Sequence, residues 1–262
     1  MMDPFTVKKI RWIVFICSAI FSSAFAYDGH FYLGAEYGKS FAHLTESDPT
    51  ITYYNNYLTD AYPLNNSNAS TAMEDLKGGY EFSGAGWRPA IAVGLGIYNT
   101  PNAYQYSGQL IETAQGDPSD TLYDDQFSVR SMRVMAETKF TWNLPYHVEP
   151  FAEMGLGSSW NHFNAYNETV AGQNGYVALP GFQSHTSNNF AYQAGLGVGY
   201  GFNFKNFNVR DTGFQHERVS LGYRFADLGH VGSDTRGAEY PYSLQVGRLR
   251  TNDVYLNFTH LF

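Results

Sequence analysis

Charged residues occupy alternate positions in several segments whose other positions are largely apolar. Both signs are present in nearly equal number. Those that share the polar face of these segments are Glu36, Arg88, Arg133, Glu137, Lys139, Glu149, Glu153, Arg218 and Arg224. If these faces enclose a narrow interior, the groups are poorly hydrated, and each needs a partner of opposite charge. The pattern favours a structural polar network, and a charge-lined pore is the alternative.

Two of these carboxylates, Glu137 and Glu153, are the candidates for a general acid–base pair. Such a pair needs one carboxyl group whose surroundings keep it protonated. The arginines on the same faces would pair with both carboxylates, and nothing in the sequence marks either as a proton donor. We therefore expect no catalytic residue and no enzyme activity.

The eight histidines show no spacing that would bring metal ligands together. His43, His185 and His230 fall in expected loops or at strand ends, and His260 falls on an apolar face. Protein metal sites need several converging ligands. The sequence therefore predicts neither a metal site nor a cofactor.

The elements that must position these residues are strands. Apolar or aromatic residues alternate with glycine, alanine or charged residues, as a half-buried strand requires. Eight segments show the pattern over the length that a tilted strand needs to cross a bilayer. They cover about 29–41, 87–98, 103–112, 127–141, 147–160, 190–204, 218–225 and 254–262.

The two faces of these segments differ in size. In the clearest one, Tyr192, Leu196 and Val198 alternate with Gly195 and Gly197. A glycine-rich face is too small for an ordinary water-facing surface, but it suits the interior of a narrow barrel. We predict an all-β fold, a transmembrane antiparallel up-and-down β-barrel. Eight strands are expected, and ten are the alternative because the first loop is long enough to hold another hairpin.

The connections alternate in length. Those at 99–102 and 143–146 are short and contain turn residues, whereas loops are expected at about 42–86, 113–126, 161–189 and 229–252. Short turns on one side and long loops on the other are typical of outer-membrane barrels. The long loops are therefore predicted to be extracellular.

The N-terminus has the pattern of a secretory signal peptide. Lys8, Lys9 and Arg11 precede an apolar run from Trp12 to Phe21, and an Ala-Phe-Ala cleavage site ends at Ala26. We expect residues 1–26 to be removed after Sec-type export and residues 27–262 to form the barrel. Cys17 would leave with the signal peptide. The net charge of −8 makes nucleic acid an unexpected partner.

The C-terminal segment alternates up to a final aromatic residue. Its outward face is expected to contain Val254, Leu256, Phe258, His260 and Phe262. Such a strand must close the barrel and face lipid.

Two motifs and this C-terminal pattern resemble the OmpA-like outer-membrane β-barrel superfamily. Residues 221–229 read LGYRFADLG, and residues 150–157 read PFAEMGLG. The resemblance covers essentially the whole chain after residue 26. Among barrel-only members, the chain is most similar to outer-membrane proteins of the Legionella and Coxiella type. The resemblance implies that the C-terminal residues are an assembly signal read by the barrel-assembly machinery.

The leading functional hypothesis is an integral protein of the cell outer membrane with a structural and surface-interaction role. Its loops contain tyrosine and asparagine, residues suited to adaptable recognition, and would meet the environment or host surface molecules. Outer-membrane lipid and lipopolysaccharide are expected partners, and the chain is expected to be a monomer. The alternatives are a small solute pore and, less favoured, a lipid A-modifying enzyme, for which His162 is the best-placed residue.

Overall fold

The computed structural model describes residues 29–45, 50–53, 58–84, 87–114, 121–170, 182–202, 216–235 and 243–262. The predicted signal peptide, residues 1–26, lies outside them. Within these ranges, no helix is long and apolar enough to cross a membrane.

The described chain is built almost entirely from strands. A 3-10 turn, η2 (Pro145–His147), lies between two of them. The strands are β1 (Gly29–Thr45), β2 (Thr50–Tyr53), β3 (Leu58–Ala61), β4 (Leu64–Asn66), β5 (Asn68–Phe82), β6 (Ala90–Asn99), β7 (Tyr104–Ala114), β8 (Thr121–Thr141), β9 (Val148–Val170), β10 (His185–Phe202), β11 (His216–Gly232) and β12 (Gln245–Leu261).

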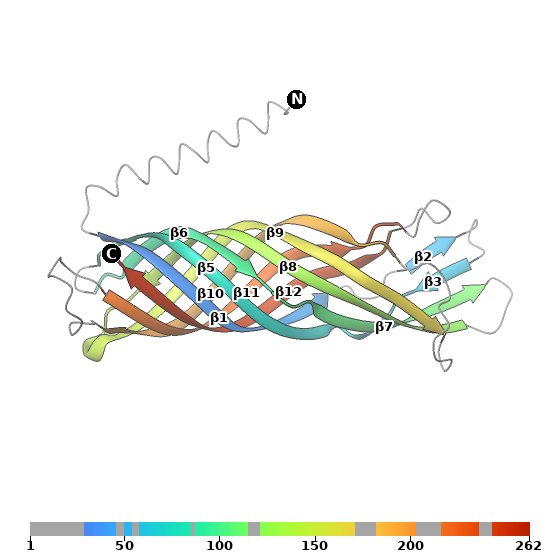
Figure 1. The fold of residues 1–262 in the computed structure, drawn as a ribbon, viewed down its shortest axis with the longest axis horizontal. Coiled ribbons are helices and arrows are strands. Elements are labelled where there is room, and N and C mark those ends of the chain that lie inside the picture. The colour runs from blue at the N-terminus through green and yellow to red at the C-terminus, as the bar shows by residue number, and fades with distance from the viewer. Residues whose placement is uncertain are drawn as a thin grey trace, which may run out of the picture.

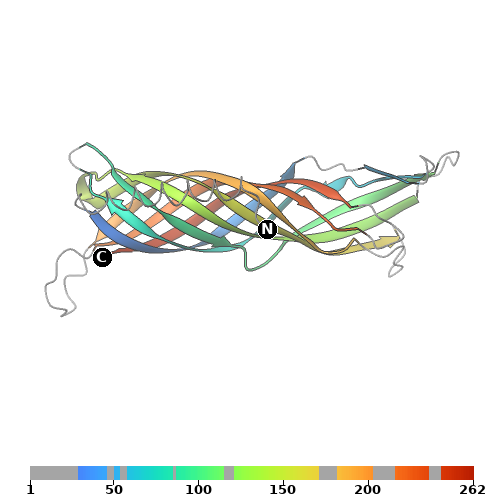
Figure 2. The same cartoon turned by 90° about the horizontal axis from the view of Figure 1, so that it is seen from above.

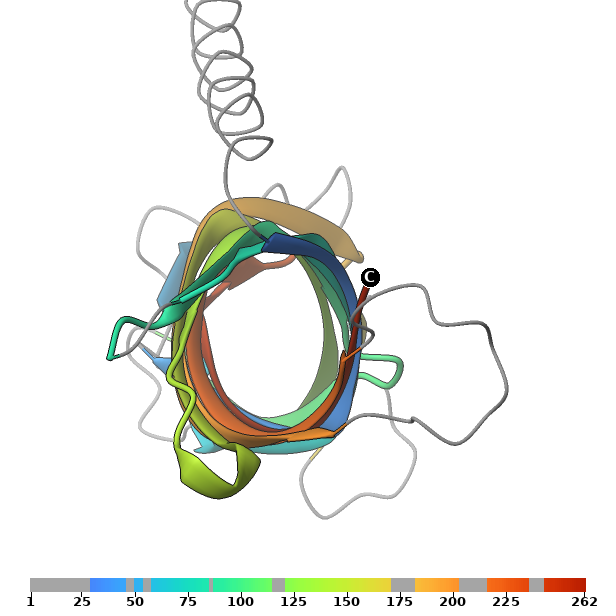
Figure 3. The ribbon, with the colours of Figure 1, turned by 90° about the vertical axis from the view of Figure 1, so that its left-hand side faces the viewer.

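Eight strands close into a ring by antiparallel pairing. The order around the ring is β1, β5, β6, β8, β9, β10, β11 and β12, and β12 pairs with β1 from Tyr32↔Leu261 to Thr45↔Arg248. Figure 3 looks along the axis of this ring. The predicted eight-stranded antiparallel barrel is confirmed. The start of β1 and the end of β12 lie at the same end of the barrel, here called the terminal end; the other end is the distal end (Figure 1).

A belt of large apolar side chains covers the outside of the ring. Leu95, Leu196 and Leu256 are 62%, 63% and 59% exposed, and similar residues occupy the outward positions of the other ring strands. The same belt contains Val254, Phe258 and Phe262 of the predicted assembly signal. A continuous apolar belt of this extent is unfavourable in water and matches the hydrocarbon core of a bilayer.

Glycines occupy inward positions beside large aromatic side chains. A Cβ atom at Gly222 would collide with the ring of Tyr255, and one at Gly197 would collide with the ring of Phe151. The glycine-rich faces therefore make space for aromatic rings that fill the lumen.

One predicted loop and one predicted turn were wrong. The loop at 42–86 contains β5, which pairs with β1 over its length and with β6 from Glu74 to Phe82, and so crosses the barrel. The segment at 99–102 does not reverse the chain. Instead, β6 and β7 run in the same direction and pair with successive parts of β8. The predicted strand at 103–112 is therefore not a separate crossing, and β6 runs opposite to the expected direction.

Thr100 connects the segment between β6 and β7 to β8. Thr100 donates its backbone N–H and its hydroxyl to the carbonyl of Ser131, at 3.1 and 3.0 Å, and its hydroxyl accepts the N–H of Ser131 at 3.1 Å. The barrel wall thus continues past Pro101, which has no N–H to donate.

At the distal end, the wall continues well beyond the apolar belt. β8 and β9 contain 21 and 23 residues, about twice the number needed to cross a bilayer. Their distal halves form a sheet with β7, to which β3 and β4 pair, while β2 pairs with β3. We call this sheet the distal extension (Figure 2). The predicted loops at 113–126, 161–189 and 229–252 are correspondingly shorter, because strands occupy their ends.

Candidate functional site

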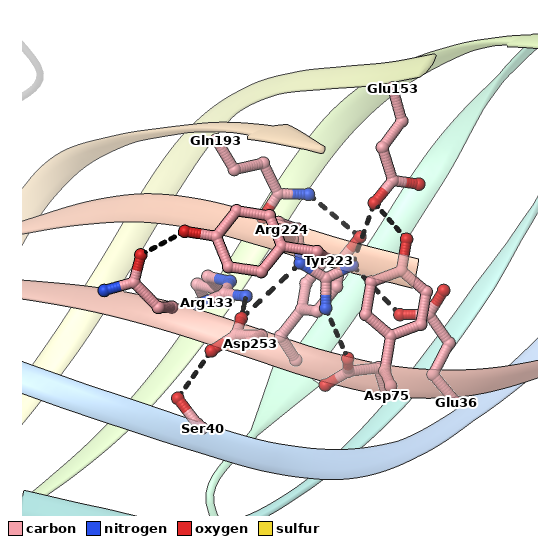
Figure 4. Close-up of polar contacts among 12 residues, drawn as sticks. Glu36, Ser40, Asp75, Arg133, Glu153, Gln193, Tyr223, Arg224 and Asp253 are labelled. Atoms are coloured by element: carbon pink, nitrogen blue, oxygen red, sulfur yellow. Dashed lines mark hydrogen bonds and ion pairs between the residues drawn. The ribbon is translucent and has the colours of Figure 1, made fainter. Parts of the chain in front are cut away.

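The lumen is crossed by a network of charged side chains centred on Arg224 of β11. This side chain is completely buried, and it donates to Glu36 and Asp75 at 2.9 Å each and to Glu153 at 3.4 Å (Figure 4). Its Nε also lies 3.5 Å from Asp253. One guanidinium group therefore joins carboxylates from four other strands, β1, β5, β9 and β12.

A second cation, Arg133 of β8, extends the network toward the distal end. Arg133 donates to Asp253 at 2.7 Å. Asp253 also accepts a hydrogen bond from the hydroxyl of Ser40 at 2.5 Å. The Ser40 hydroxyl oxygen in turn accepts a hydrogen bond from the hydroxyl of Tyr104 at 2.7 Å. The chain of contacts crosses from β8 through β12 and β1 to β7.

A third cation, Lys77 of β5, completes the centre. Its ammonium group lies 2.5 Å from Glu36 and 3.4 Å from Glu153. Tyr255 donates to Glu153 at 2.6 Å, and the Arg224 guanidinium lies 4.4 and 4.6 Å from the ring centroids of Tyr98 and Tyr255. Buried charges are tolerated when they are paired and hydrogen-bonded in this way. We call these residues the lumen network: Glu36, Asp75, Lys77, Tyr98, Arg133, Glu137, Glu153, Gln193, Arg224, Asp253 and Tyr255.

Glu137 is held by neutral donors. The hydroxyl of Tyr98 and the amide of Gln193 both donate to it. The two carboxylates considered above for acid–base chemistry are thus both bound within the lumen network, since Glu153 accepts from Arg224 and Tyr255.

A second ion-paired group lies nearer the terminal end. Arg218 donates to Glu81 at 2.9 Å and to Glu149. These residues line an open cavity of about 630 Å³ at the terminal end. Farther in, cavities of about 20 and 10 Å³ touch the lumen network. Each holds about one water molecule.

The structure places eight of the nine predicted lumen residues inside the barrel. Arg88 is the exception: it lies exposed in the turn between β5 and β6, because the strand begins only at Ala90. Lys139 faces the lumen, but its ammonium group lies 4.0 Å from the centroid of the Phe151 ring and has no ion-pair partner among the residues described.

Four further charged residues face the lumen that were not among the predicted ones. Asp75, Lys77 and Glu81 belong to β5, which was assigned to a loop. Asp253 alternates with the outward residues of the C-terminal strand, so its inward position followed from the same parity.

A cluster of buried apolar residues closes the lumen on the distal side of the network. The rings of Phe127 and Phe163 stack with centroids 5.1 Å apart, and Tyr106 stacks on Phe127 at 5.4 Å. We call this cluster the apolar plug; its members are Leu44, Tyr104, Tyr106, Phe127, Val129, Phe163, Leu228 and Leu249, all at most 2% exposed.

The distal extension encloses three carboxyl groups. Asp125 of β8 lies opposite Glu168 of β9, and Tyr166 donates to Glu168 at 2.5 Å. Across the sheet, Tyr62 donates to Asp60 at 3.1 Å. Burial, followed by the neighbouring carboxylate of Glu168, raises the pKa of Asp125 to about 7. This group lies outside the apolar belt, because the belt on β8 begins at Met132.

The remaining candidates for chemistry have other partners. His162 lies on the outer face, where its Nδ1 is 2.9 Å from the hydroxyl of Thr186. His260 binds Glu217 at 2.7 Å near the terminal end. Among the residues that the structure describes, no group of three or more histidine, cysteine or acidic side chains is arranged to hold a metal ion.

Comparisons with known proteins give structural likeness only. No protein-family profile matches the chain, and no curated protein matches its sequence. Among solved structures, Neisserial surface protein A is 12% identical, with 88% of this chain and 97% of that chain covered and a TM-score of 0.44. Ail of Yersinia pestis is 13% identical (88% and 99% covered, TM-score 0.33), and OprG of Pseudomonas aeruginosa is 11% identical (90% and 97% covered, TM-score 0.33).

The class of the protein rests on its own geometry. In the closed ring of eight strands each strand pairs with a neighbour on both sides, and the outward belt is apolar. These two features define a transmembrane β-barrel of the outer-membrane type.

Proposed function

We propose that the chain is a non-conducting surface protein of the bacterial outer membrane, in which the barrel is an anchor and the distal extension is the part that meets the environment or a host surface. The distal end is then extracellular. The segment at residues 221–229, which resembles a motif of the OmpA-like superfamily, contains Arg224, the centre of the lumen network.

The observation that carries this proposal is the closed lumen beneath an elaborated distal sheet. The two cavities that touch the lumen network measure about 10 and 20 Å³, whereas the larger cavity at Arg218 opens at the terminal end. A solute path needs a continuous wet channel, which eight-stranded barrels rarely leave. By contrast, β8 and β9 project far beyond the belt and bring strands β2, β3 and β4 with them.

A loop replacement separates the anchor from the binding surface. The ladder between β1 and β5 ends at His43↔Asn68, and the N–H of Leu44 donates to the carbonyl of Ser67 at 2.9 Å. Residues 46–65 can therefore be replaced by Asn-Gly, which favours a two-residue hairpin turn between paired strands. The replacement removes β2, β3 and part of β4 but none of the ring.

The experiment compares refolded wild type and the 46–65 replacement for binding to cultured host cells and to abiotic polymer surfaces. Both proteins should show the heat-modifiable gel migration of a folded barrel. We expect the replacement to lose most of the binding. If folded wild type adheres no better than a folded eight-stranded barrel with short loops, the proposed surface role is wrong.

A further inference from the structure

Two arginines occupy neighbouring outward positions on β12, directly distal to the apolar belt. Arg248, Arg250, Asn252 and Val254 lie on the same outward face of the strand, with the arginines at the distal side. Val254 belongs to the belt and is 45% exposed. The side chains of Arg248 and Arg250 are 36% and 43% exposed. Outward side chains two residues apart lie roughly 7 Å from one another, because a strand rises about 3.4 Å per residue.

A single carboxylate orients both guanidinium groups. The Nε of Arg248 donates to both oxygens of Asp227, at 2.8 and 2.9 Å, and the Nε of Arg250 donates to one of them at 3.2 Å. Asp227 is itself fixed, since it also accepts the N–H of Gly229 at 3.1 Å. Asp227 thus orients two guanidinium groups at once.

The terminal nitrogens of Arg250 remain available. Its one hydrogen bond within the described residues uses Nε, so its Nη1 and Nη2 donors have no protein acceptor there. On the neighbouring strand β1, the residue paired with Arg250 is His43. The His43 ring is hydrogen-bonded to Asn68, and histidine has no carboxylate to offer Arg250. Arginine nitrogens held in this way suit a phosphate, which accepts two parallel hydrogen bonds.

Aromatic residues set the depth of this cluster in the membrane. Tyr192 of β10 donates to Asp227 at 3.3 Å, and its ring lies 6.4 Å from that of Phe225. Tyr223 donates to Asn252 at 2.5 Å; it and Tyr192 are 44% and 39% exposed. Tyrosines with apolar bodies and hydrogen-bonded hydroxyls mark the interface between hydrocarbon and headgroups.

We propose that Arg248 and Arg250, oriented by Asp227, form a site for a phosphate group of lipid A in the outer leaflet. This inference rests on the proposed outer-membrane orientation. A soluble sulfated glycan would present similar anions, but the position beside the apolar belt and its tyrosines favours a ligand whose acyl chains lie along the barrel wall.

The test uses the refolded mature chain in phosphatidylcholine nanodiscs with a small fraction of bisphosphorylated lipid A, and counts bound lipid A by native mass spectrometry. The variants are Arg250→Gln and the double change Arg248→Gln with Arg250→Gln. Arg88→Gln is the matched control, because Arg88 is an exposed arginine in the turn at the terminal end. Heat-modifiable migration verifies folding of each protein.

We expect wild type and Arg88→Gln to retain lipid A equally, Arg250→Gln to retain about fivefold less, and the double variant about tenfold less. Dephosphorylated lipid A should bind weakly to all four. Equal retention by the double variant and wild type overturns the proposal, as does equal binding of dephosphorylated lipid A. Displacement of lipid A by a soluble sulfated oligosaccharide assigns the site to glycans instead. None of these outcomes changes the cell-binding result, so the two proposals fail separately.

Discussion

The guanidinium group of Arg224 donates to the carboxylate of Asp75 at 2.9 Å, although the two residues are 149 positions apart in the chain. The contact joins β11 to β5 across the lumen, between strands that do not pair with each other in the ring. It shows how the barrel is held from inside as well as by its backbone ladder, and it makes the interior charges a source of testable predictions.

Replacement of Arg224 by leucine should destabilise the barrel strongly. The change leaves the buried carboxylates of Glu36 and Asp75 without their shared cation, and breaking a buried ion pair costs about 3–5 kcal/mol. Urea unfolding in phosphatidylcholine vesicles, followed by tryptophan fluorescence, measures the loss. Arg88→Leu is the control and should change the free energy of unfolding by less than about 0.5 kcal/mol. Similar midpoints for both variants would contradict the structural role of the lumen network.

Two neighbouring inward glycines should respond differently to alanine. A Cβ atom at Gly197 would overlap the carbonyl of Leu221 and the ring of Phe151, whereas one at Gly199 would meet its nearest atoms at 3.4 Å. Gly197→Ala should therefore cost about 1–3 kcal/mol, the range for overpacking, and Gly199→Ala should cost little. The same urea assay compares them. An equal loss for the two variants would show that the inner wall is not packed as described.

The distal extension should open more readily as the pH rises. The pKa of Asp125 is raised to about 7 from its ordinary value of 3.8. Between about pH 4 and pH 7, Asp125 is therefore protonated in the folded extension but ionised in the opened form. The contribution of this proton to the stability of the extension is fully present below about pH 4 and is lost as the pH rises through 7. Hydrogen exchange of β8 and β9 amides distal to the belt, corrected for the intrinsic rate, should show less protection at pH 8 than at pH 5.

The matched variant for this effect is Asp125→Asn, which keeps the shape of the side chain and removes its charge. The nearby acidic groups are Glu168 and Asp124, and only Asp125 should account for the difference around neutral pH. The variant should be at least as protected at pH 8 as wild type is at pH 5. A pH dependence in Asp125→Asn equal to that of wild type would assign the effect to another group.

The sequence predicts the belt well because lipid imposes a simple rule. Outward residues such as Leu196 and Leu256 must be apolar, so strict alternation identifies β10 and β12 directly. β5 escapes this rule: its inward face contains Asp75 and Lys77, and its outward face includes Ser70 and Glu74 near the distal end. Alternation is clear only from Asp75 to Phe82, a stretch shorter than a membrane crossing needs.

The lumen network was predictable in kind but not in its pairings. Parity alone turns Glu153 and Arg224 inward, yet which carboxylate meets which cation depends on the register between strands far apart in sequence. The error at Arg88 has a local cause, since β6 starts three residues later than the alternation suggests. The plug was not predicted, because its residues lie partly in segments assigned to loops, as Phe163 and Leu249 do near the distal ends of their strands.

The most direct test of the closed lumen is the conductance of the refolded chain in planar lipid bilayers at neutral pH and high salt, with a sixteen-stranded porin as the positive control. Among the residues that the structure describes, the two cavities found beside the lumen network measure about 10 and 20 Å³, room for about one water molecule each. The wild-type protein should leave the membrane silent after insertion, with insertion verified by protease protection. Steady, discrete conductance steps from the folded wild type would contradict the account and favour a pore.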